Sequence, residues 1–525
     1  MTHNRLFAVL GSILCAAFAA SLEAKTLRWS SQGDISTMDP HAQNEGLNNA
    51  ASAHIYESLY AYDKKMDVEP CLATSWERIG ETTFRFKLRP NVRFHDGTPF
   101  SADDVVFSLE RAMAPTSNFK VLTEGIAKVV KVDDLTVDIL TDGPAPVLIK
   151  QLPGLRIMSK AWSESHDVRV PQDFRNKQET FASRNANGTG PYMLKSREAD
   201  VKTVFVANPK WWGKREGNVD EIVYLPIKSD GTRMAALLSG EIDFVLDPPI
   251  QDLPRLEKNP GMKVVNGTEN RTIFLGMDVW RDELLYGSVK GKNPFKDARV
   301  RRAMYHAIDI EAIKNQVMRG LARPAGTMIA PSVFGYTKEA DKRLAFDPVR
   351  ARKLLAEAGY PTGFEVTLDC PNNRYVNDEK ICVALAAMLA KVDIKVKVNA
   401  MSRALFFPKV QKYDTSFYLI GWGVATLDSL NALQTVIHSP GKGADGEQNY
   451  GKYSNATVDA AIDKLKVEND PKRRIELTTE ALMLHREEAG HIPLHYPIIP
   501  WAMRSGVTVN HLSNNWFMVK WVTVK

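Results

Sequence analysis

Two hydrophobic periods alternate along the chain. Apolar and polar residues alternate singly over 25–31 and 83–88, which is typical of strands with one buried face. Apolar residues at helical spacing occupy 105–113, and Ser101 and Asp104 have the spacing of a helix N-cap just before them. Both periods recur to the end of the sequence, and such mixing predicts an α/β protein.

The clearest unit has the order helix, strand, helix, strand, and its last three elements form a βαβ unit. Such units form mostly parallel sheets, and ligands bind beyond the carboxyl ends of their strands. The loops after Leu368 and Ile420 are therefore the first places to expect a site. The four predicted elements are a helix over 348–358 stopped by Gly359, a strand over 364–368, a helix over 378–391 and a strand over 394–398.

Four further elements are predicted from the same patterns. They are strands over 203–207 and 221–227, a helix over 231–238, and a long helix over 299–319 that ends at Gly320. No short internal repeat and no low-complexity linker occurs, so composition sets no domain boundary.

Length and composition limit the class of protein. A chain of 525 residues exceeds the size of a single hydrophobic core and indicates two to four domains. With 44% hydrophobic and 25% charged residues, the composition is that of a soluble globular protein. The net charge of +6 is dispersed without a Lys/Arg run, so we expect no nucleic-acid partner.

The N-terminus has the features of a secretory signal, predicted over residues 1–24. Arg5 precedes an apolar stretch over 6–20 that is too short to span a bilayer comfortably, and small residues follow it. Cleavage after Ala24 is favoured, with Ala19 as the alternative; a retained anchor is the competing interpretation. No other stretch has the roughly twenty apolar residues of a membrane helix, so we expect a water-soluble periplasmic protein.

Export permits disulfides, and three cysteines remain after processing. Cys370 ends a predicted strand and Cys382 lies on the next predicted helix, so a bridge between them is conceivable, which leaves Cys71. The cysteines have no CxxC spacing, and prolines and glycines break any helix that would align His485, His491 and His495. We therefore expect neither a metal nor a cofactor.

A series of short strings occurs in order along the whole mature chain. The strings include TMDPH at 37–41, FKLRPNVRFHDGTPFSADDVVFSLERA at 86–112, GTGPY at 188–192, NPKWWG at 208–213, VRRAMYHAIDIEAI from 300 and KLLAEAGYP at 353–361. In these strings and in their order the chain resembles the peptide-binding class of ABC-importer solute-binding proteins, the family of the dipeptide, oligopeptide and nickel binding proteins.

The resemblance implies a periplasmic-binding-protein-like α/β fold with two lobes and a hinge (class II, cluster C) and three structural domains, one of them inserted. It also implies a monomeric protein that closes on a peptide or peptide-like solute and delivers it to an ABC-importer permease. The implied boundaries are domain I at 25–66, 186–277 and 488–525, domain II at 67–185, and domain III at 278–487.

The predicted loop after the strand at 364–368 has a composition suited to a ligand. Arg374 can hold a carboxylate through two parallel hydrogen bonds, and Asn372, Asn373 and Tyr375 lie beside it. In the resembled family an Arg in this region meets the carboxylate end of a dipeptide. The competing interpretation is a surface Arg paired with Asp378 or Glu379.

A second loop follows Ile420. Gly421 and Gly423 would let a ligand backbone approach, and Trp422 offers a flat wall unless it is a core residue. Members of the resembled family that take free peptides place an Asp shortly after this Trp, to pair with the ligand ammonium, whereas this chain has Ala425. Asp428 and Asn431 are the polar candidates here, and a blocked, opine-like or sugar-conjugated ligand stays open beside a free peptide.

The opposite wall of the cleft is assigned from position and resemblance to Ser31, Gln32 and Tyr56. No GxSxG or HExxH motif occurs, and no acid–base pair is evident, so we expect no enzyme. An exported hydrolase of peptides or glycans is the alternative from another class. A sensory binding protein for a chemoreceptor would have the same fold and the same site.

Overall fold

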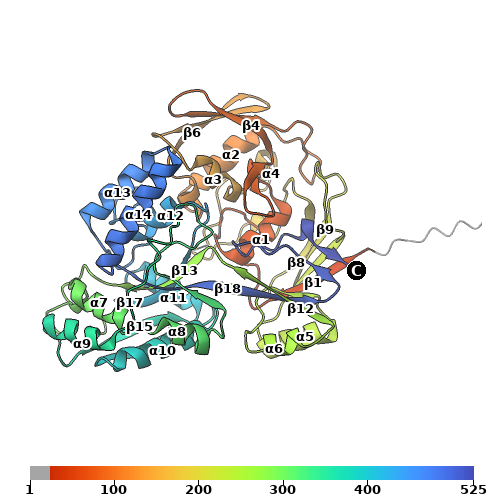
Figure 1. Cartoon of the computed structure of the whole chain (residues 1–525). Coiled ribbons are helices and arrows are strands. Elements are labelled where there is room, and N and C mark those ends of the chain that lie inside the picture. Colours follow the sequence, from red (N-terminus) through yellow and green to blue (C-terminus); the bar gives the residue numbers. More distant parts are fainter. Residues whose placement is uncertain (1–23, 175) are drawn as a thin grey trace, which may run out of the picture.

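The computed structural model describes residues 24–174 and 176–525 and contains one long mixed sheet that passes through two lobes (Figure 1). Positions 1–23 of the predicted signal sequence lie outside this part of the chain. The strands along the sheet are β16 (Ile394–Met401), β15 (Phe364–Pro371), β17 (Phe417–Gly423), β13 (Arg271–Met277), β18 (Ile492–Arg504), β11 (Phe244–Val245), β1 (Thr26–Ser31), β10 (Glu221–Pro226), β9 (Lys202–Ala207) and β8 (Tyr192–Glu198).

Strand β18 joins the two lobes. The first lobe contains β1 and β8 to β12 (Met262–Thr268), and the second lobe contains β13 to β17, of which β14 spans Ala322–Pro324. The first residues of β18 pair with β13 and β14 in the second lobe, and its later residues pair with β12 and β11 in the first. The chain also crosses between β12 and β13, at Glu269 and Asn270. Strand β13 thus lies in the second lobe, so this crossing comes earlier than the boundary predicted after residue 277. Two strand connections side by side are a natural hinge.

The second lobe contains the predicted βαβ unit. Strand β15 runs parallel to β16 and β17, and α10 (Asp378–Ala390) connects β15 to β16. The sheet is mixed rather than parallel throughout, because β13 runs antiparallel to both β17 and β18. A disulfide joins Cys370 on β15 to Cys382 on α10, with 6.7 Å between their Cα atoms, and Cys71 is free and buried.

The predicted helix over 299–319 is wrong as a single element. Helix α7 (Ala298–His306) stops, and α8 (Ile310–Ala312) begins anew and continues as the π-helical turn Ile313–Val317. Asp309 causes the restart, because its backbone is extended and its carboxylate accepts the N–H of Ala312. An Asp is a common N-cap residue, so the sequence contained a signal for this restart. The apolar period continues across Asp309, however, and for that reason a single helix was predicted.

Other helices complete the second lobe. They are α9 (Pro348–Glu357), α11 (Arg403–Gln411), α12 (Ser429–Ala432), α13 (Ala456–Val467) and α14 (Pro471–Glu487). Residues of α12 to α14 share an apolar core with residues of β13 and β17, whereas α7, α9 and α10 contribute to a separate core with β15. The second-lobe sheet therefore has apolar contacts with two helix groups, which holds the ends of β15 and β17 in fixed positions.

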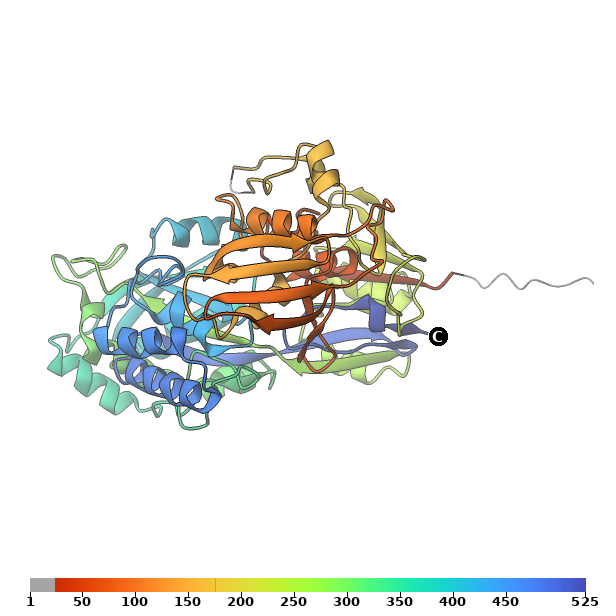
Figure 2. The same ribbon diagram turned by 90° about the horizontal axis from the view of Figure 1, so that it is seen from above.

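A separate four-stranded antiparallel sheet, orange in Figure 2, lies over the middle of the molecule. Helix α2 (Ala102–Met113) packs on it, and Ser101 and Asp104 form the predicted capping box. The strands in order are β4 (Ala73–Arg78), β5 (Thr83–Leu88), β7 (Thr136–Thr141) and β6 (Ile126–Asp133).

A buried ion pair ties α2 to the first lobe. The guanidinium of Arg111 donates to both carboxylate oxygens of Asp39 at 2.7 Å, and both side chains are fully buried. The TMDPH string is thus explained by structure, since Asp39 also accepts the N–H groups of His41 and Gln172.

The remaining elements are short, apart from α1 and α5. They are α1 (Gly46–Ile55), α3 (Leu148–Gln151), α4 (Lys160–Ser165), α5 (Asp230–Ser239), α6 (Leu253–Glu257), β2 (Tyr60–Tyr62), β3 (Val68–Pro70), β19 (Val507–Thr508) and β20 (Thr523–Val524). Within residues 24–174 and 176–525, no helix combines the length and apolar character needed to cross a membrane.

Candidate functional site

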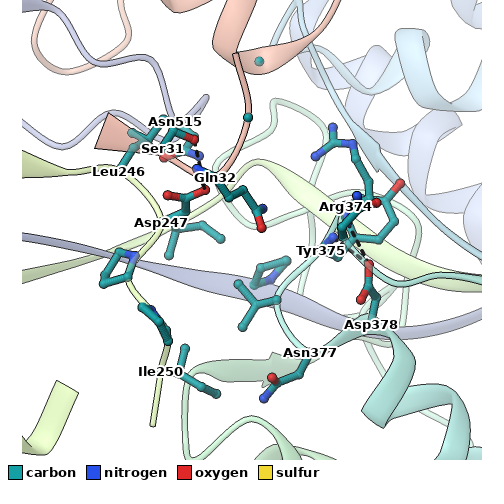
Figure 3. A pocket seen from close by; sticks show the side chains of 18 of the residues that line it. Ser31, Gln32, Leu246, Asp247, Ile250, Arg374, Tyr375, Asn377, Asp378 and Asn515 are labelled. Carbon is teal, nitrogen blue, oxygen red and sulfur yellow. Dashed lines mark hydrogen bonds between the residues drawn. The ribbon is translucent and has the colours of Figure 1, made fainter. Parts of the chain in front are cut away.

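A cavity of about 630 Å³ lies between the two lobes. Ser31 and Gln32, at the end of β1, form one wall together with Asp247, and Arg374 and Tyr375 face them from the second lobe (Figure 3). The β18 residues Pro497, Ile499 and Pro500 also contribute to the lining. The cavity therefore has walls from both lobes and lies beside the hinge.

A second cavity of about 370 Å³ continues from the first toward Trp422. The two share a set of lining residues, so they are chambers of one interlobe cleft. The shared residues are Glu45, Gly46, Arg271, Arg374, Tyr375 and Asn514. A third cavity of about 470 Å³ lies beside the first and shares Gln32, Gly33, Asn373 and Arg403 with it.

The loop after β15 is held by the start of α10. The carboxylate of Asp378 accepts the backbone N–H groups of Arg374 at 2.9 Å and Tyr375 at 3.0 Å. The Arg374 guanidinium lies 4.9 Å from the centre of the Tyr375 ring. Across the described chain no carboxylate forms an ion pair with it, so the predicted alternative of a pair with Asp378 or Glu379 does not occur. Asn372 and Asn373 line the same cavity.

Tyr375 connects this loop to the one after β17. Its hydroxyl accepts the N–H of Gly421 at 2.9 Å and donates to the carbonyl of Gly421 at 3.3 Å. A Cβ at Gly421 would lie 2.5 Å from Ile273, and one at Gly423 would lie 3.0 Å from Arg271. These two glycines line the second chamber, but they permit packing within the protein, which is a different reason from the predicted approach of a ligand.

Trp422 serves both the core and the cleft wall. It is half-buried against the core that α12 to α14 share with the sheet, and it lines the second chamber. Its indole N–H donates to the side-chain oxygen of Asn431 at 3.0 Å, which fixes the ring plane. Asn431 also lines the chamber.

Two predicted site residues do not line any of the three cavities. Asp428 is buried, with one carboxylate oxygen 2.6 Å from Arg474 and the other 3.0 Å from Lys150, and it caps α12. Tyr56 is fully buried in the apolar core of the first lobe, where burial raises the pKa of its phenol. Both assignments to the cleft are corrected, because the chain itself encloses these side chains.

The first-lobe wall has its own polar network. Asp247 accepts from the hydroxyl of Ser31 at 3.0 Å and from the backbone N–H of Gln32 at 3.1 Å. Burial raises the pKa of the Asp247 carboxyl, an effect that the nearby Arg233 opposes. This network orients the end of β1 toward the second lobe.

Sequence reasoning missed two ion pairs in the cleft. Arg271 donates to Glu269 at 3.0 Å across the crossing between β12 and β13. Arg403 of α11 lies 3.3 Å from Glu45 at the start of α1, so this pair bridges the lobes. No local motif marks any of these residues, and the pair of Glu45 with Arg403 forms only when elements far apart in the sequence meet.

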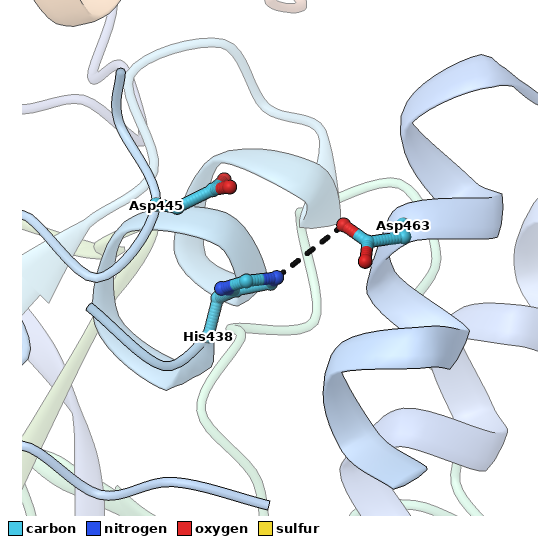
Figure 4. A group of neighbouring side chains, drawn as sticks. All are labelled: His438, Asp445 and Asp463. Carbon is cyan, nitrogen blue, oxygen red and sulfur yellow. Dashed lines mark hydrogen bonds and ion pairs between the residues drawn. The ribbon is translucent and has the colours of Figure 1, made fainter. Parts of the chain in front are cut away.

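Histidine and carboxylate clusters outside the cleft have internal partners. His438, Asp445 and Asp463 lie close enough to hold a cation (Figure 4). However, the ammonium of Lys466 lies 2.7 Å from an oxygen of each carboxylate and already supplies the positive charge. His485 and His491 are hydrogen-bonded to each other at 3.0 Å inside the core.

Comparisons with known proteins agree with this architecture. The model of the bacterial extracellular solute-binding proteins, family 5, middle region, matches residues 67–444. The glutathione-binding protein GsiB of Shigella dysenteriae is 28% identical over 505 residues, covering 94% of this chain and 93% of that protein. The chain therefore belongs to family 5 of the bacterial extracellular solute-binding proteins.

Solved structures give the same fold. The periplasmic binding protein DppA of Helicobacter pylori, in complex with the peptide STSA, superposes with a TM-score of 0.80 at 26% identity, covering 95% of this chain and 98% of that one. The dipeptide-binding protein of Pseudoalteromonas sp. SM9913 gives a TM-score of 0.82 at 22% identity, covering 95% and 100%. These relatives are binding proteins, so the predicted fold class and solute-binding function are confirmed.

Proposed function

We propose that this protein binds a small carboxylate-bearing solute, a peptide or a peptide-like compound, between its lobes and delivers it to the permease of an ABC importer. The observation that carries the proposal is the Arg374 guanidinium. It lines both chambers of the cleft, and no carboxylate of the described chain forms an ion pair with it. A ligand carboxylate would complete a bidentate pair there.

Binding couples to closure of the lobes. The described chain already makes contacts from one side of the cleft to the other, through Glu45 to Arg403 at 3.3 Å and through the Tyr62 hydroxyl to the carbonyl of Ala425 at 3.0 Å. A ligand drives closure only to the extent that it binds the closed form more tightly than the open form. Contacts to both Arg374 and the Ser31 wall give that preference.

The same proposal includes export and a non-enzymatic role. The family is extracellular, and the N-terminal pattern of a signal sequence supports a periplasmic location. The proposal also takes the protein to be a monomer. The carboxylates of the first chamber support binding rather than catalysis, because neighbours engage all of them except the exposed Glu379. The engaged ones are Glu45, Asp230, Asp247, Glu269 and Asp378. General acid–base hydrolysis needs two such groups free at one bond.

The test is ligand binding to protein stripped of bound solute by unfolding and refolding. Glutathione, an alanyl dipeptide and a tetrapeptide are titrated by calorimetry, and native mass spectrometry identifies any solute that co-purifies. We expect a bound solute with a carboxylate, a smaller scattering radius on binding, and recovery of the solute chemically unchanged. Cleavage of the solute, or tight binding without any change in radius, would reject the proposal.

A further inference from the structure

The two chambers of the cleft differ in chemistry. The first is lined by many charged groups, including Asp230, Asp247 and Arg403, which do not line the second. The second, here called the amide chamber, is lined by nine Asn or Gln residues together with aromatic rings that include Trp422 and Trp516. Amide side chains present donors and acceptors without charge. The amide chamber therefore suits a neutral, hydrogen-bonding group.

Two of the charged side chains that border the amide chamber are already compensated. Glu45 pairs with Arg403, and Arg271 pairs with Glu269. Position 425 carries Ala, and its carbonyl accepts the Tyr62 hydroxyl. The other charged side chains have no ion-pair partner within the described chain, and they are two cations, Lys120 and Arg374, and one exposed carboxylate, Glu447. A primary ammonium would thus find its counter-charge only at Glu447.

One buried donor points to an oxygen on the ligand. The side-chain nitrogen of Asn514 is buried and has no hydrogen-bond partner in the described chain, while the side-chain oxygen accepts the N–H of Trp516 at 3.0 Å. Asn514 lies where the two chambers meet. A buried N–H without a partner is costly. A hydroxyl or carbonyl oxygen can accept from it, whereas an ammonium cannot.

We propose that the amide chamber receives an uncharged polyhydroxylated end of the ligand, while the carboxylate of the same ligand meets Arg374. The substrate class is thus an amino-acid carboxylate joined to a sugar or sugar-alcohol chain. Its hydroxyls match the amides, because each both donates and accepts, and the faces of Trp422 and Trp516 cover its carbon skeleton. This inference rests on the proposed function and specifies the ligand of the same cleft.

Three probes with the same leucine carboxylate test the inference. They are N-gluconoyl-leucine, alanyl-leucine and N-acetyl-leucine, titrated by calorimetry into stripped protein. We expect N-gluconoyl-leucine to bind at least tenfold more tightly than the other two. Equal or tighter binding of alanyl-leucine overturns the inference and leaves the proposed function standing. Binding of none of the three also overturns it, and the proposed function then survives only if another solute binds in a manner that needs Arg374.

Two variants make the test specific. Asn514→Ala removes the buried donor, and we expect about fivefold weaker binding of N-gluconoyl-leucine, as for the loss of one hydrogen bond. A smaller loss for N-acetyl-leucine, which has the same amide carbonyl but no hydroxyl, would show that a hydroxyl accepts from Asn514, whereas an equal loss would assign the contact to the carbonyl and contradict this part of the inference. Glu447→Gln removes the exposed carboxylate that borders the chamber. If this change weakens binding of alanyl-leucine, the one probe with an amine, and the unchanged protein prefers alanyl-leucine, the chamber recognises an ammonium and the inference is overturned. Asn469→Ala removes an exposed amide that lines none of the three cavities, so it is the matched control and should leave the binding of all three probes unchanged.

Discussion

Arg374 and Asp428 follow neighbouring strands of the second lobe, β15 and β17, yet their surroundings differ completely. The Asp428 carboxylate is enclosed and neutralised by Arg474 and Lys150. The Arg374 guanidinium lies on the cleft wall against the Tyr375 ring, without an ion pair in the described chain. A charge that the fold compensates supports the fold, and a charge left uncompensated at a cavity is available to a ligand.

The largest effect is expected from removing an ion-pair partner of the compensated charge, Asp428. Arg474→Met removes the 2.6 Å partner of Asp428 and leaves the buried carboxylate with the partly exposed Lys150 alone. We expect a loss of about 3 kcal/mol in the free energy of unfolding, at the lower end of the cost of breaking a buried ion pair, because Lys150 still compensates part of the charge. Urea denaturation measures it. Asp428→Asn in the same chain should recover part of the loss, and an unchanged midpoint for Arg474→Met would contradict this account of Asp428.

The uncompensated charge, Arg374, should affect ligand binding rather than stability. Arg374→Ala is expected to weaken binding of the carboxylate ligand by roughly a hundredfold, as for the loss of a charged bidentate contact. The unfolding midpoint of the empty protein should change little, since the Arg374 side chain has no internal ion pair. Calorimetry and thermal unfolding measure the two quantities. Arg374→Lys tests geometry and should recover only part of the affinity.

Buried histidines extend the comparison to pH. Burial, and to a smaller extent the positive charge of Arg343, lowers the pKa of His495 to about 3. In the unfolded chain this ring takes up a proton near pH 6.5. The unfolded state is therefore favoured as the pH falls from 6.5 toward 3, by about 1.4 kcal/mol per unit for one histidine.

The matched variant His495→Gln isolates this effect, because the other titrating groups are common to both proteins. As the pH falls from 6.5 to 5, we expect the free energy of unfolding of the variant, relative to that of the original protein, to rise by about 1.4 kcal/mol per pH unit. Denaturation at several pH values gives the difference. A constant difference over that range would mean that the folded protein accommodates the protonated ring.

The smallest effect is expected at the pair that bridges the lobes. Glu45→Gln removes the ion pair with Arg403. The Glu45 side chain is 20% exposed and the Arg403 side chain is 32% exposed. A partly exposed pair contributes about 0.2–1 kcal/mol, so affinity should fall by a few-fold at most. The dependence of affinity on salt should also weaken. A loss as large as that of Arg374→Ala would show that Glu45 contacts the ligand directly.

Local sequence was sufficient for much of the fold. The capping box at Ser101 and Asp104, the strand over 364–368 and the helix over 378–391 were all predictable, because period, cap and turn act within a few residues. The long helix over 299–319 was not, since the cap at Asp309 overrides an apolar period that continues through it. The rule that ligands bind beyond the carboxyl ends of strands also predicted the loops of Arg374 and Trp422, both of which line the cleft.

The sequence alone determined which elements form, which family the chain resembles, and that Arg374 carries a charge at the end of a strand. Tertiary structure alone decided where charges meet. It enclosed Asp428 and Tyr56, brought Glu45 to Arg403 from the other lobe, and gave the glycines after Ile420 their packing partners. The physical reason is range, because capping and periodicity act along the chain, whereas burial and ion pairing depend on neighbours that only folding supplies.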